Sequence, residues 1–422
     1  MQVVDHVVQW LPARSTYRQL LYGVVVGLAL SLTASSVVHC NRWQKQNTSP
    51  PVLDPRLIEP RRDEVVDGVV GLIGNTPLVR INSLSNALGV EILGKAEFMN
   101  PGGSVKDRVA LRVITDAEEQ GLLRPHTSSR IFEGTVGSTA IIMPDDVAEE
   151  KVKALLALGA EVERVRPASI VDKKQNLARD RASIFVPPGH LLQTASASVV
   201  VTTTADGALA DDKLTNSKEE RESATKPRGF FADQFENRSN YYAHYDGTGP
   251  EIWRQTSGAV DAFVSGAGTG GTLAGPKRDI LVAMSDPEGS GLYNKVKYGG
   301  TKRRHQSTRS SRAWINRLTH NFELALPIID DAFRVTDEEA VAMSRYLVHH
   351  DGLFLGSSSA CNLVACIRLV KKLKWKSGER IVTILCDSGC RHYSKFWNDE
   401  YLAKAKIPID MGIIDRMLTG SV

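Results

Sequence analysis

The chain has 422 residues, of which 42% are hydrophobic, 24% charged and 6% aromatic, a composition typical of globular proteins and a length that leaves room for two domains with separate cores. A formal net charge of +4 over this length is too small to indicate a nucleic-acid-binding protein. The five cysteines include no C-x-x-C pair, so we expect neither a zinc site nor a disulfide framework.

The amino-terminal segment differs from the rest of the chain. Residues 20–38 read LLYGVVVGLALSLTASSVV, without a charge, and a helix of that length just spans a bilayer core of ~30 Å. A secretory signal peptide and a cleaved organelle-targeting sequence are the competing interpretations, but the apolar run is long for the first and not amphipathic as the second requires. We expect a single transmembrane helix with undecided orientation, followed by a proline-rich linker, together filling residues 1–64.

Behind the linker, strand-like and helix-like segments alternate. Val109, Val113 and Ala117 recur at helical spacing, and Gly121 marks a helix end. In chain order we expect a strand at residues 92–96, a helix from residue 106 onward, a helix and then a strand within 151–165, a strand at 259–266, a helix at 338–352 and a strand at 380–387. This alternation predicts α/β architecture with parallel sheets.

Two local patterns add detail. Ser104 with Asp107 three residues later predicts a capping box, which would place Lys106 in the first turn of its helix. Residues 190–228 are rich in Thr, Ala, Ser, Asp and Lys and show no sustained amphipathic period, so they predict a disordered surface insertion.

Three motifs bring polar groups together with flexible backbone. NPGGSVKDR, residues 100–108, places two glycines three and four residues before Lys106, which is unusual for a solvated surface lysine. SGAGTGGTL, residues 265–273, follows a strand, so its backbone N–H groups can converge on an anion, and it lacks the signature of a nucleotide-triphosphate loop. EGTVGSTA, residues 133–140, offers hydroxyl donors that could hold a carboxylate. A lysine beside a phosphate cradle is the combination that pyridoxal phosphate needs.

The whole set of motifs resembles one family. IGNTPLVRI, NPGGSVKDR, EGTVGST, LGAEVERVRP, GTGPEIWRQT, SGAGTGGT, GSSSA and LCDSGCRHYSKFW occur in order between residues 68 and 398. They are similar to those of the cysteine synthase and cystathionine β-synthase family of fold-type II pyridoxal-phosphate enzymes, and most of all to its membrane-anchored fungal cysteine synthase branch. The resemblance implies a two-domain α/β fold like the tryptophan synthase β-subunit, with domains at residues 65–236 and 237–422, and a homodimer.

The resemblance also implies roles for individual residues. Lys106 would form the Schiff base with the cofactor and later carry the proton of the substrate α-carbon, and Ser358 would bond the pyridine nitrogen. The cofactor phosphate would bind to Gly268, Thr269, Gly270, Gly271 and Thr272. The substrate carboxylate would bind to Thr135, Gly137, Ser138 and Thr139, with Gln234 nearby. Ser138 stands where most of the family has an asparagine that bonds the ring hydroxyl of the cofactor.

The implied reaction is β-replacement, in which O-acetyl-L-serine loses acetate and sulfide adds to give L-cysteine. A cystathionine β-synthase-type enzyme shares nearly all of the motifs, and the motifs do not identify the sulfur nucleophile. A serine/threonine dehydratase fits them less well. The family branch implies a mitochondrial location, although the sequence does not identify the membrane.

Three segments are shorter or different from the family pattern. No residues remain for a crossover helix after EGTVGSTA, only PKRD separates GTGGTLAG from the next apolar run, and STRSSRAWI (residues 307–315) replaces a glycine-rich loop. Faulty exon boundaries in a predicted gene would explain these differences. The rival hypothesis is a paralogue that has lost activity and persists as a membrane-bound, non-catalytic protein.

Overall fold

The computed structural model describes residues 65–123, 125, 127, 129–133, 140–144, 147–165, 170–184, 229–275, 280–300 and 318–420. The expected membrane helix at 20–38, the linker up to residue 64, the insertion at 190–228, the loop at 134–139 and the stretch at 307–315 lie outside these residues. In the described part of the chain, no helix is both long enough and apolar enough to cross a membrane.

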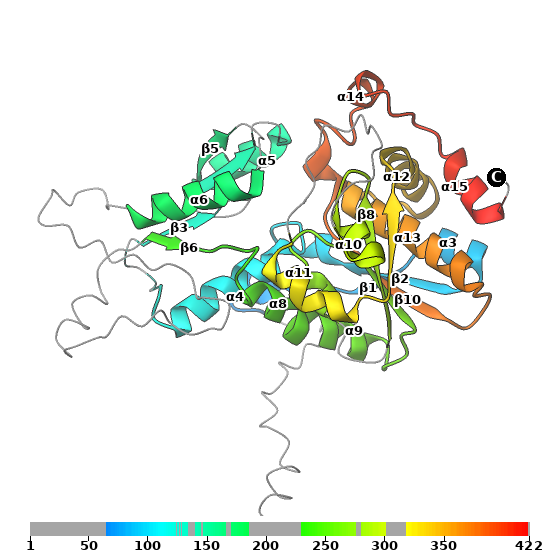
Figure 1. The fold of residues 1–422 in the computed structure, drawn as a ribbon, viewed down its shortest axis with the longest axis horizontal. Coiled ribbons are helices and arrows are strands. Elements are labelled where there is room, and N and C mark those ends of the chain that lie inside the picture. Colours follow the sequence, from blue (N-terminus) through cyan, green and yellow to red (C-terminus); the bar gives the residue numbers. More distant parts are fainter. Residues whose placement is uncertain are drawn as a thin grey trace, which may run out of the picture. The chain divides into compact units, whose positions relative to one another are not determined.

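The strands form two sheets (Figure 1). The six-stranded sheet has the order β1-β2-β10-β7-β8-β9, and the four-stranded sheet has the order β5-β4-β3-β6. Every neighbouring pair is parallel except β1 and β2, which are antiparallel. The strands are β1 Leu78–Arg80, β2 Glu91–Ala96, β3 Arg130–Glu133, β4 Ala140–Pro144, β5 Glu161–Val165, β6 Gly229–Phe231, β7 Ala262–Gly266, β8 Leu281–Pro287, β9 Asp331–Val335 and β10 Arg380–Leu385.

Helices fill most of the connections between the strands. The α-helices are α3 Asn82–Leu88, α4 Lys106–Glu119, α5 Glu149–Ala157, α6 Ile170–Ser183, α8 Ser239–Tyr242, α9 Gly249–Gln255, α10 Leu292–Tyr298, α11 His320–Ala325, α12 Asp337–Asp351, α13 Ser357–Leu373, α14 Asp399–Lys404 and α15 Gly412–Thr419. Shorter turns are η1 Val69–Leu72, η2 Glu97–Met99, η3 Ala243–Thr248, η4 Gly271–Ala274, η5 Leu326–Ile328 and η6 Gly389–His392.

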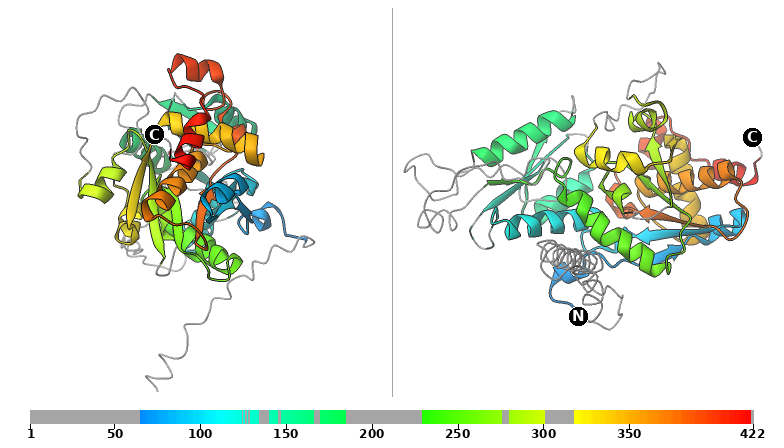
Figure 2. Two further views of the ribbon diagram at one scale, coloured as in Figure 1. Left: turned by 90° about the vertical axis from the view of Figure 1, so that its right-hand side faces the viewer. Right: turned by 60° about the horizontal axis from the view of Figure 1, so that its bottom comes forward.

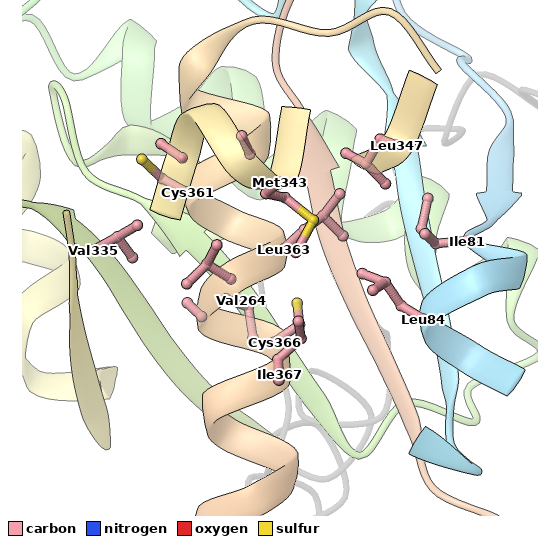
Figure 3. Close-up of a cluster of buried hydrophobic side chains, with 14 of the residues drawn as sticks. Ile81, Leu84, Val264, Val335, Met343, Leu347, Cys361, Leu363, Cys366 and Ile367 are labelled. Atoms are coloured by element: carbon pink, nitrogen blue, oxygen red, sulfur yellow. The ribbon is translucent and has the colours of Figure 1, made fainter. Parts of the chain in front are cut away.

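The six-stranded sheet is covered on both faces (Figure 1, Figure 2). Helices α3, α12, α13 and α15 pack on one face and α9, α10 and α11 on the other. Successive residues of a strand point to opposite faces, so that Val264 joins the first cluster and Phe263 the second. Figure 3 shows Val264 among Met343 of α12 and Leu363 of α13, all fully buried.

The four-stranded sheet follows the same rule. Ile142 packs with α6 on one face, whereas its neighbour Ile141 packs with α5 on the other. Helix α4 covers β6 through Phe230. Because β2 pairs with β10 and β1 pairs with β2, the six-stranded sheet takes strands from both sides of the boundary at residue 236 suggested by the sequence; that boundary stays a prediction.

The strand and helix predictions are confirmed, with ends that shift by a few residues. The predicted elements correspond to β2, α4, α5 with β5, β7, α12 and β10. The capping box is wrong, because Val105 already has helical dihedral angles and no side chain caps the helix. The Asp107 carboxylate instead accepts a hydrogen bond from the Gly102 N–H group, since a glycine leaves room for the approach.

The structure joins β3 and β4 as parallel neighbours with only residues 134–139 between them. A parallel crossover usually takes a dozen residues or more because the chain must return along the whole strand. Here Phe132 pairs with Ala140, so β4 starts beside the end of β3 and the return path is short. Within GTGGTLAG the chain forms the single turn η4, and the residues PKRD that follow this motif lie outside the described residues.

Candidate active site

The motifs meet at one edge of the six-stranded sheet. Strands β2, β10 and β7 are parallel neighbours, so their carboxyl ends lie together. The chain leaves β2 toward Lys106, leaves β10 toward Asp387 and leaves β7 toward Gly268. In open parallel sheets, ligands bind at this kind of edge, where strands inserted out of chain order meet.

Lys106 is the first residue of α4 and its side chain is exposed. The preceding Val105 donates its backbone N–H to the Cys386 carbonyl at 3.0 Å, which ties the start of the helix to the end of β10. Among the described residues, the Lys106 amine has neither a hydrogen-bond partner nor an ion-pair partner. It is therefore available to a ligand.

A buried charge network fixes the helix that carries Lys106. Arg108 bonds Glu97 through Nε and Nη2 at 2.7 and 2.8 Å, and Glu251 through Nη1 and Nη2 at 2.6 and 2.7 Å. Lys95 pairs with Glu251 at 2.6 Å. Thr76 of the GNTP motif donates to Glu97 at 2.7 Å. The two cations balance the two carboxylates, which is how charges are tolerated in a protein interior.

The pKa values in this network follow from burial and pairing. Burial raises the pKa of the Glu251 carboxyl, but the bonds from Arg108 and the charge of Lys95 outweigh it and bring the value to about 2. Burial also raises the pKa of the Glu97 carboxyl, but Arg108 outweighs it and holds the pKa below the ordinary value. The pKa of Arg108 is raised. All three groups stay charged near neutral pH, so Arg108 holds α4 firmly two residues beyond Lys106.

The glycine-rich loop after β7 lies tightly against its surroundings. Gly270 has φ +94°, and a Cβ there would lie 2.4 Å from the Phe322 Cα. A Cβ on Gly271 would lie 2.2 Å from Asn240 Oδ1. Thr319 donates to the Thr269 carbonyl at 2.6 Å. Among the described residues, the N–H groups of Gly268, Thr269 and Gly270 have no acceptor, so three successive donors are free for an anion.

A buried histidine supports this loop. His244 contacts Thr272 Oγ1 at 3.4 Å through Nε2 and Thr248 Oγ1 at 3.0 Å through Nδ1. Burial and the charge of Arg108 lower the pKa of His244 to about 4, so the ring is neutral at physiological pH. The sequence reasoning missed this residue, although it stands three residues before the quoted GTGPEI motif.

The three serines of GSSSA start helix α13 and differ in their surroundings. Ser359 is fully buried and accepts a hydrogen bond from the Cys386 N–H at 2.8 Å. Ser358 is exposed, and its hydroxyl has no partner among the described residues. The Gly356 N–H group bonds the Asp387 carbonyl at 3.0 Å, so the segment after β10 touches both the Lys106 segment and the start of α13.

The sequence reasoning also missed an acid–base pair in this segment. Asp387 Oδ2 lies 2.7 Å from His392 Nε2, and this pairing lowers the pKa of Asp387 against the effect of its burial. Both residues belong to the quoted LCDSGCRHYSKFW motif. Arg391, beside His392, donates to the Gly102 carbonyl at 2.5 Å. The segment therefore also holds the glycine loop in front of Lys106.

Gln234 lies where β3 and β6 end. Its backbone N–H donates to Glu133 Oε2 at 3.1 Å, and its carbonyl accepts from Asn240 Nδ2 at 2.7 Å. Since Asn240 also borders Gly271, this residue links Gln234 to the glycine-rich loop. The predicted carboxylate-binding residues Thr135, Gly137, Ser138 and Thr139 lie outside the described residues, directly after Glu133.

The segment after β10 thus contacts both the residue before Lys106 and the start of α13, which carries Ser358, and the loop of Gly268 to Thr272 follows the neighbouring strand β7. These residues fit pyridoxal phosphate on three counts. A free amine suits its aldehyde, three free N–H groups suit its phosphate, and a free hydroxyl suits its ring nitrogen.

The comparisons with known proteins agree with this fit. Residues 69–206 and 190–387 match the model of the family described as pyridoxal-phosphate dependent enzyme. Cysteine synthase 2 of Schizosaccharomyces pombe is 48% identical over 377 residues, 82% of this chain and 87% of that protein. The putative mitochondrial cysteine synthase of Saccharomyces cerevisiae is 43% identical over 366 residues, 79% of this chain and 84% of that protein. The crystal structure of a hydrogen sulfide-producing enzyme from Fusobacterium nucleatum superposes with a TM-score of 0.58 at 26% identity, covering 78% of this chain and all of that one.

Proposed function

Since this chain belongs to the pyridoxal-phosphate-dependent enzyme family and matches cysteine synthases over most of its length, we propose that it makes L-cysteine from O-acetyl-L-serine and sulfide. The observation that carries the proposal is the position of Lys106. A lysine amine without a partner among the described residues lies at the same edge of the sheet as a loop with three N–H donors that have no acceptor among those residues, and ligands bind at this kind of edge.

Each residue of the site has a role in this proposal. Lys106 attaches the cofactor, and residues 268–272 bind its phosphate through backbone N–H groups and the hydroxyls of Thr269 and Thr272. Ser358 bonds the pyridine nitrogen. A neutral hydroxyl at that nitrogen favours β-elimination over chemistry that needs a full positive charge on the ring. When bound, pyridoxal phosphate supplies the electron sink that makes the substrate α-proton acidic.

The amino acid binds through its carboxylate. Thr135, Gly137, Ser138 and Thr139 supply donors from the loop after β3. The Gln234 side-chain amide has no partner among the described residues, and its backbone is fixed at the base of that loop by Glu133 and Asn240. This arrangement supports Gln234 as the additional carboxylate donor.

In this proposal Lys106 transfers a proton twice, once before and once after the substitution at the β-carbon. The Lys106 amine takes the proton from the α-carbon, and the Cβ–O bond breaks with its electron pair going to acetate. Hydrosulfide forms the new C–S bond, and Lys106 returns the proton to the α-carbon. Arg108 keeps α4, and with it the Lys106 backbone, in place during both transfers.

An absorption spectrum and a product assay test the function. The full chain, purified in detergent with pyridoxal phosphate, should absorb in the visible range and form cysteine from O-acetylserine and sulfide. Homocysteine in place of sulfide tests the cystathionine β-synthase-type alternative. A folded protein that neither absorbs nor turns over would instead favour the non-catalytic paralogue.

We also propose that residues 20–38 anchor the enzyme in a mitochondrial membrane and that it works as a homodimer with domains at residues 65–236 and 237–422. The uncharged run of residues 20–38 supports the anchor, and the similarity to a putative mitochondrial enzyme supports the location. Alkaline extraction of isolated mitochondria should leave the full chain in the membrane and release a chain that begins at residue 47. Light scattering of the released chain should give twice its sequence mass.

A further inference from the structure

Helix α5 belongs with the four-stranded sheet, but its first turn contacts the segment after β10. The Glu149 N–H donates to Ser394 Oγ at 3.3 Å, and the Ser394 N–H donates to Glu150 Oε1 at 3.1 Å. Ser394 follows η6, whose Arg391 bonds the Gly102 carbonyl in front of Lys106. The first turn of α5 is therefore joined to the candidate active site by two successive contacts.

Lys151 is the third residue of this helix and is half-buried. Among the described residues, its ammonium has no hydrogen-bond or ion-pair partner. Among the described residues, the charges that act on it most strongly are Lys106 on α4, Asp387 and Arg391 after β10, and Glu150 on its own helix. Burial lowers the pKa of Lys151, and Lys106 and Arg391 lower it further, against the opposing influence of Asp387 and Glu150.

Among the described residues, neither carboxylate that acts on Lys151 forms an ion pair with it. Asp387 Oδ2 pairs with His392 while Oδ1 is buried without a hydrogen-bond partner among those residues, and Glu150 accepts from Ser394. A half-buried ammonium that lacks a partner is costly, and the cheapest remedy is an anion that arrives with the substrate. Acetate is such an anion, because it gains its full negative charge only as it leaves the β-carbon.

We propose that Lys151 binds the carboxylate that leaves the β-carbon of the substrate and stabilises its growing negative charge. This inference rests on the proposed function. The Cβ–O bond breaks, its electron pair goes to the acetate oxygen, and the α-proton goes to the Lys106 amine. The Lys151 ammonium keeps its own protons and donates a charge-assisted hydrogen bond to acetate.

The test compares Lys151→Gln and Lys151→Arg with Lys153→Gln in the full chain loaded with pyridoxal phosphate. Lys153 lies on the same helix, its side chain is 74% exposed, and it pairs only with the exposed Glu149 among the described residues. Acetate release is followed in a single turnover without sulfide. Acetate binding is measured by calorimetry at constant ionic strength, which gives a readout independent of turnover.

Lys151→Gln should slow acetate release and weaken acetate binding by about 10- to 100-fold, the value of one hydrogen bond to a charged group. The KM for sulfide should not change, Lys151→Arg should restore most of the loss, and Lys153→Gln should stay within about threefold of the parent. Unchanged acetate release in Lys151→Gln, or equal losses in Lys151→Gln and Lys153→Gln, would overturn this inference and leave the proposed function standing. An unsubstituted protein without cofactor absorbance would refute the proposed function, and the inference with it.

Discussion

Arg108 and Glu251 stand 143 positions apart in the sequence, yet two guanidinium nitrogens meet both carboxylate oxygens at 2.6 and 2.7 Å. The pair joins the helix that begins at Lys106 to the GTGPEI motif on α9. Both side chains are almost completely buried. Loss of either partner would leave an uncompensated charge in the interior.

Arg108→Met should therefore lower the free energy of unfolding by about 3–5 kcal/mol. Arg112→Met is the matched control, because Arg112 lies one turn further along α4, its side chain is 37% exposed, and it pairs with Asp116 at 2.7 Å. The control should lose at most about 1 kcal/mol. Urea unfolding followed by circular dichroism measures both. Equal losses in the two variants would mean that the buried pair does not hold α4.

Lys106→Ala should remove the visible absorbance of the bound cofactor and lower turnover by about 10²- to 10⁴-fold, the range of a lost proton-transfer group. The exposed Lys106 has no partner among the described residues, so the free energy of unfolding without cofactor should change by less than about 0.5 kcal/mol. Spectra, steady-state rates and urea unfolding check the three expectations. A variant that keeps the absorbance would show that another amine attaches the cofactor.

Two glycines of the same loop should respond differently to alanine. At Gly270 the backbone has φ +94° and a Cβ would meet the Phe322 backbone, so Gly270→Ala should cost at least about 1–3 kcal/mol. Nothing lies within 4 Å of a Cβ on Gly268, so Gly268→Ala should leave thermal unfolding of the cofactor-free protein unchanged. Because Gly268 offers a free N–H toward the expected phosphate, any effect of its substitution should appear in cofactor affinity. The expectation fails if both substitutions lower the melting temperature equally.

Neighbouring serines on α13 provide a third contrast. Ser359→Ala leaves the Cys386 N–H without its acceptor and should lower the free energy of unfolding by about 1–3 kcal/mol. Ser358→Ala breaks no contact among the described residues, so stability should stay the same while the cofactor spectrum and the rate change. Spectral titration with pyridoxal phosphate and thermal unfolding separate the two effects. A cofactor spectrum that changes only in Ser359→Ala would show that Ser359, and not Ser358, bonds the ring nitrogen.

His244 makes stability depend on pH. Its pKa is about 4 in the folded protein against 6.5 for an exposed histidine, so between these values the unfolded chain takes up a proton that the folded one does not. The neutral His244 contributes about 3 kcal/mol to the free energy of unfolding above pH 6.5. This contribution is lost as the pH falls toward 4. His244→Gln should remove this part of the pH dependence.

The measurement is the difference in free energy of unfolding between the two proteins from pH 8 to pH 5. Above about pH 4.5 the Glu251 carboxyl does not interfere, since its pKa is lowered to about 2 from 4.5 and its own loss comes at lower pH. Burial raises the pKa of Asp286 to about 6. This residue is present in both proteins, so its contribution to the pH dependence cancels in the difference. A difference that does not vary with pH would show that His244 titrates normally.

Local patterns in the sequence predicted the elements that have one apolar face. Helix α4 was found because Val109, Val113 and Ala117 line one side. Helix α13 was missed as a helix, although the motif GSSSA at its start was recognised. Its residues from Ser359 to Ile367 are all buried, so no polar face reveals the helical period.

The contacts that assemble the site could not be predicted from the sequence in the same way. Lys95, Glu97 and Glu251 look like ordinary surface charges on short segments, and only the folded chain joins them to Arg108. The motifs named Lys106, Ser358 and the loop of residues 268–272, and the structure places their segments at one edge of the six-stranded sheet, while their roles toward the cofactor stay predictions. His244 and Lys151 lie outside the quoted motifs, because their importance comes from residues distant in the chain, and Asp387 lies in a motif that did not reveal its pairing with His392.

The central position of β10 affects how the protein is made. Strand β2 ends at Ala96 and β7 at Gly266, but the strand that joins them begins only at Arg380. A ribosome that adds about 5–20 residues per second needs roughly 15 to 60 s to travel from Ala96 to Arg380. During that time the nascent chain carries an unpaired edge on β2, and after Gly266 also one on β7, which other unfinished chains can join. Chaperone binding during synthesis should therefore matter most for the segments between β2 and β10.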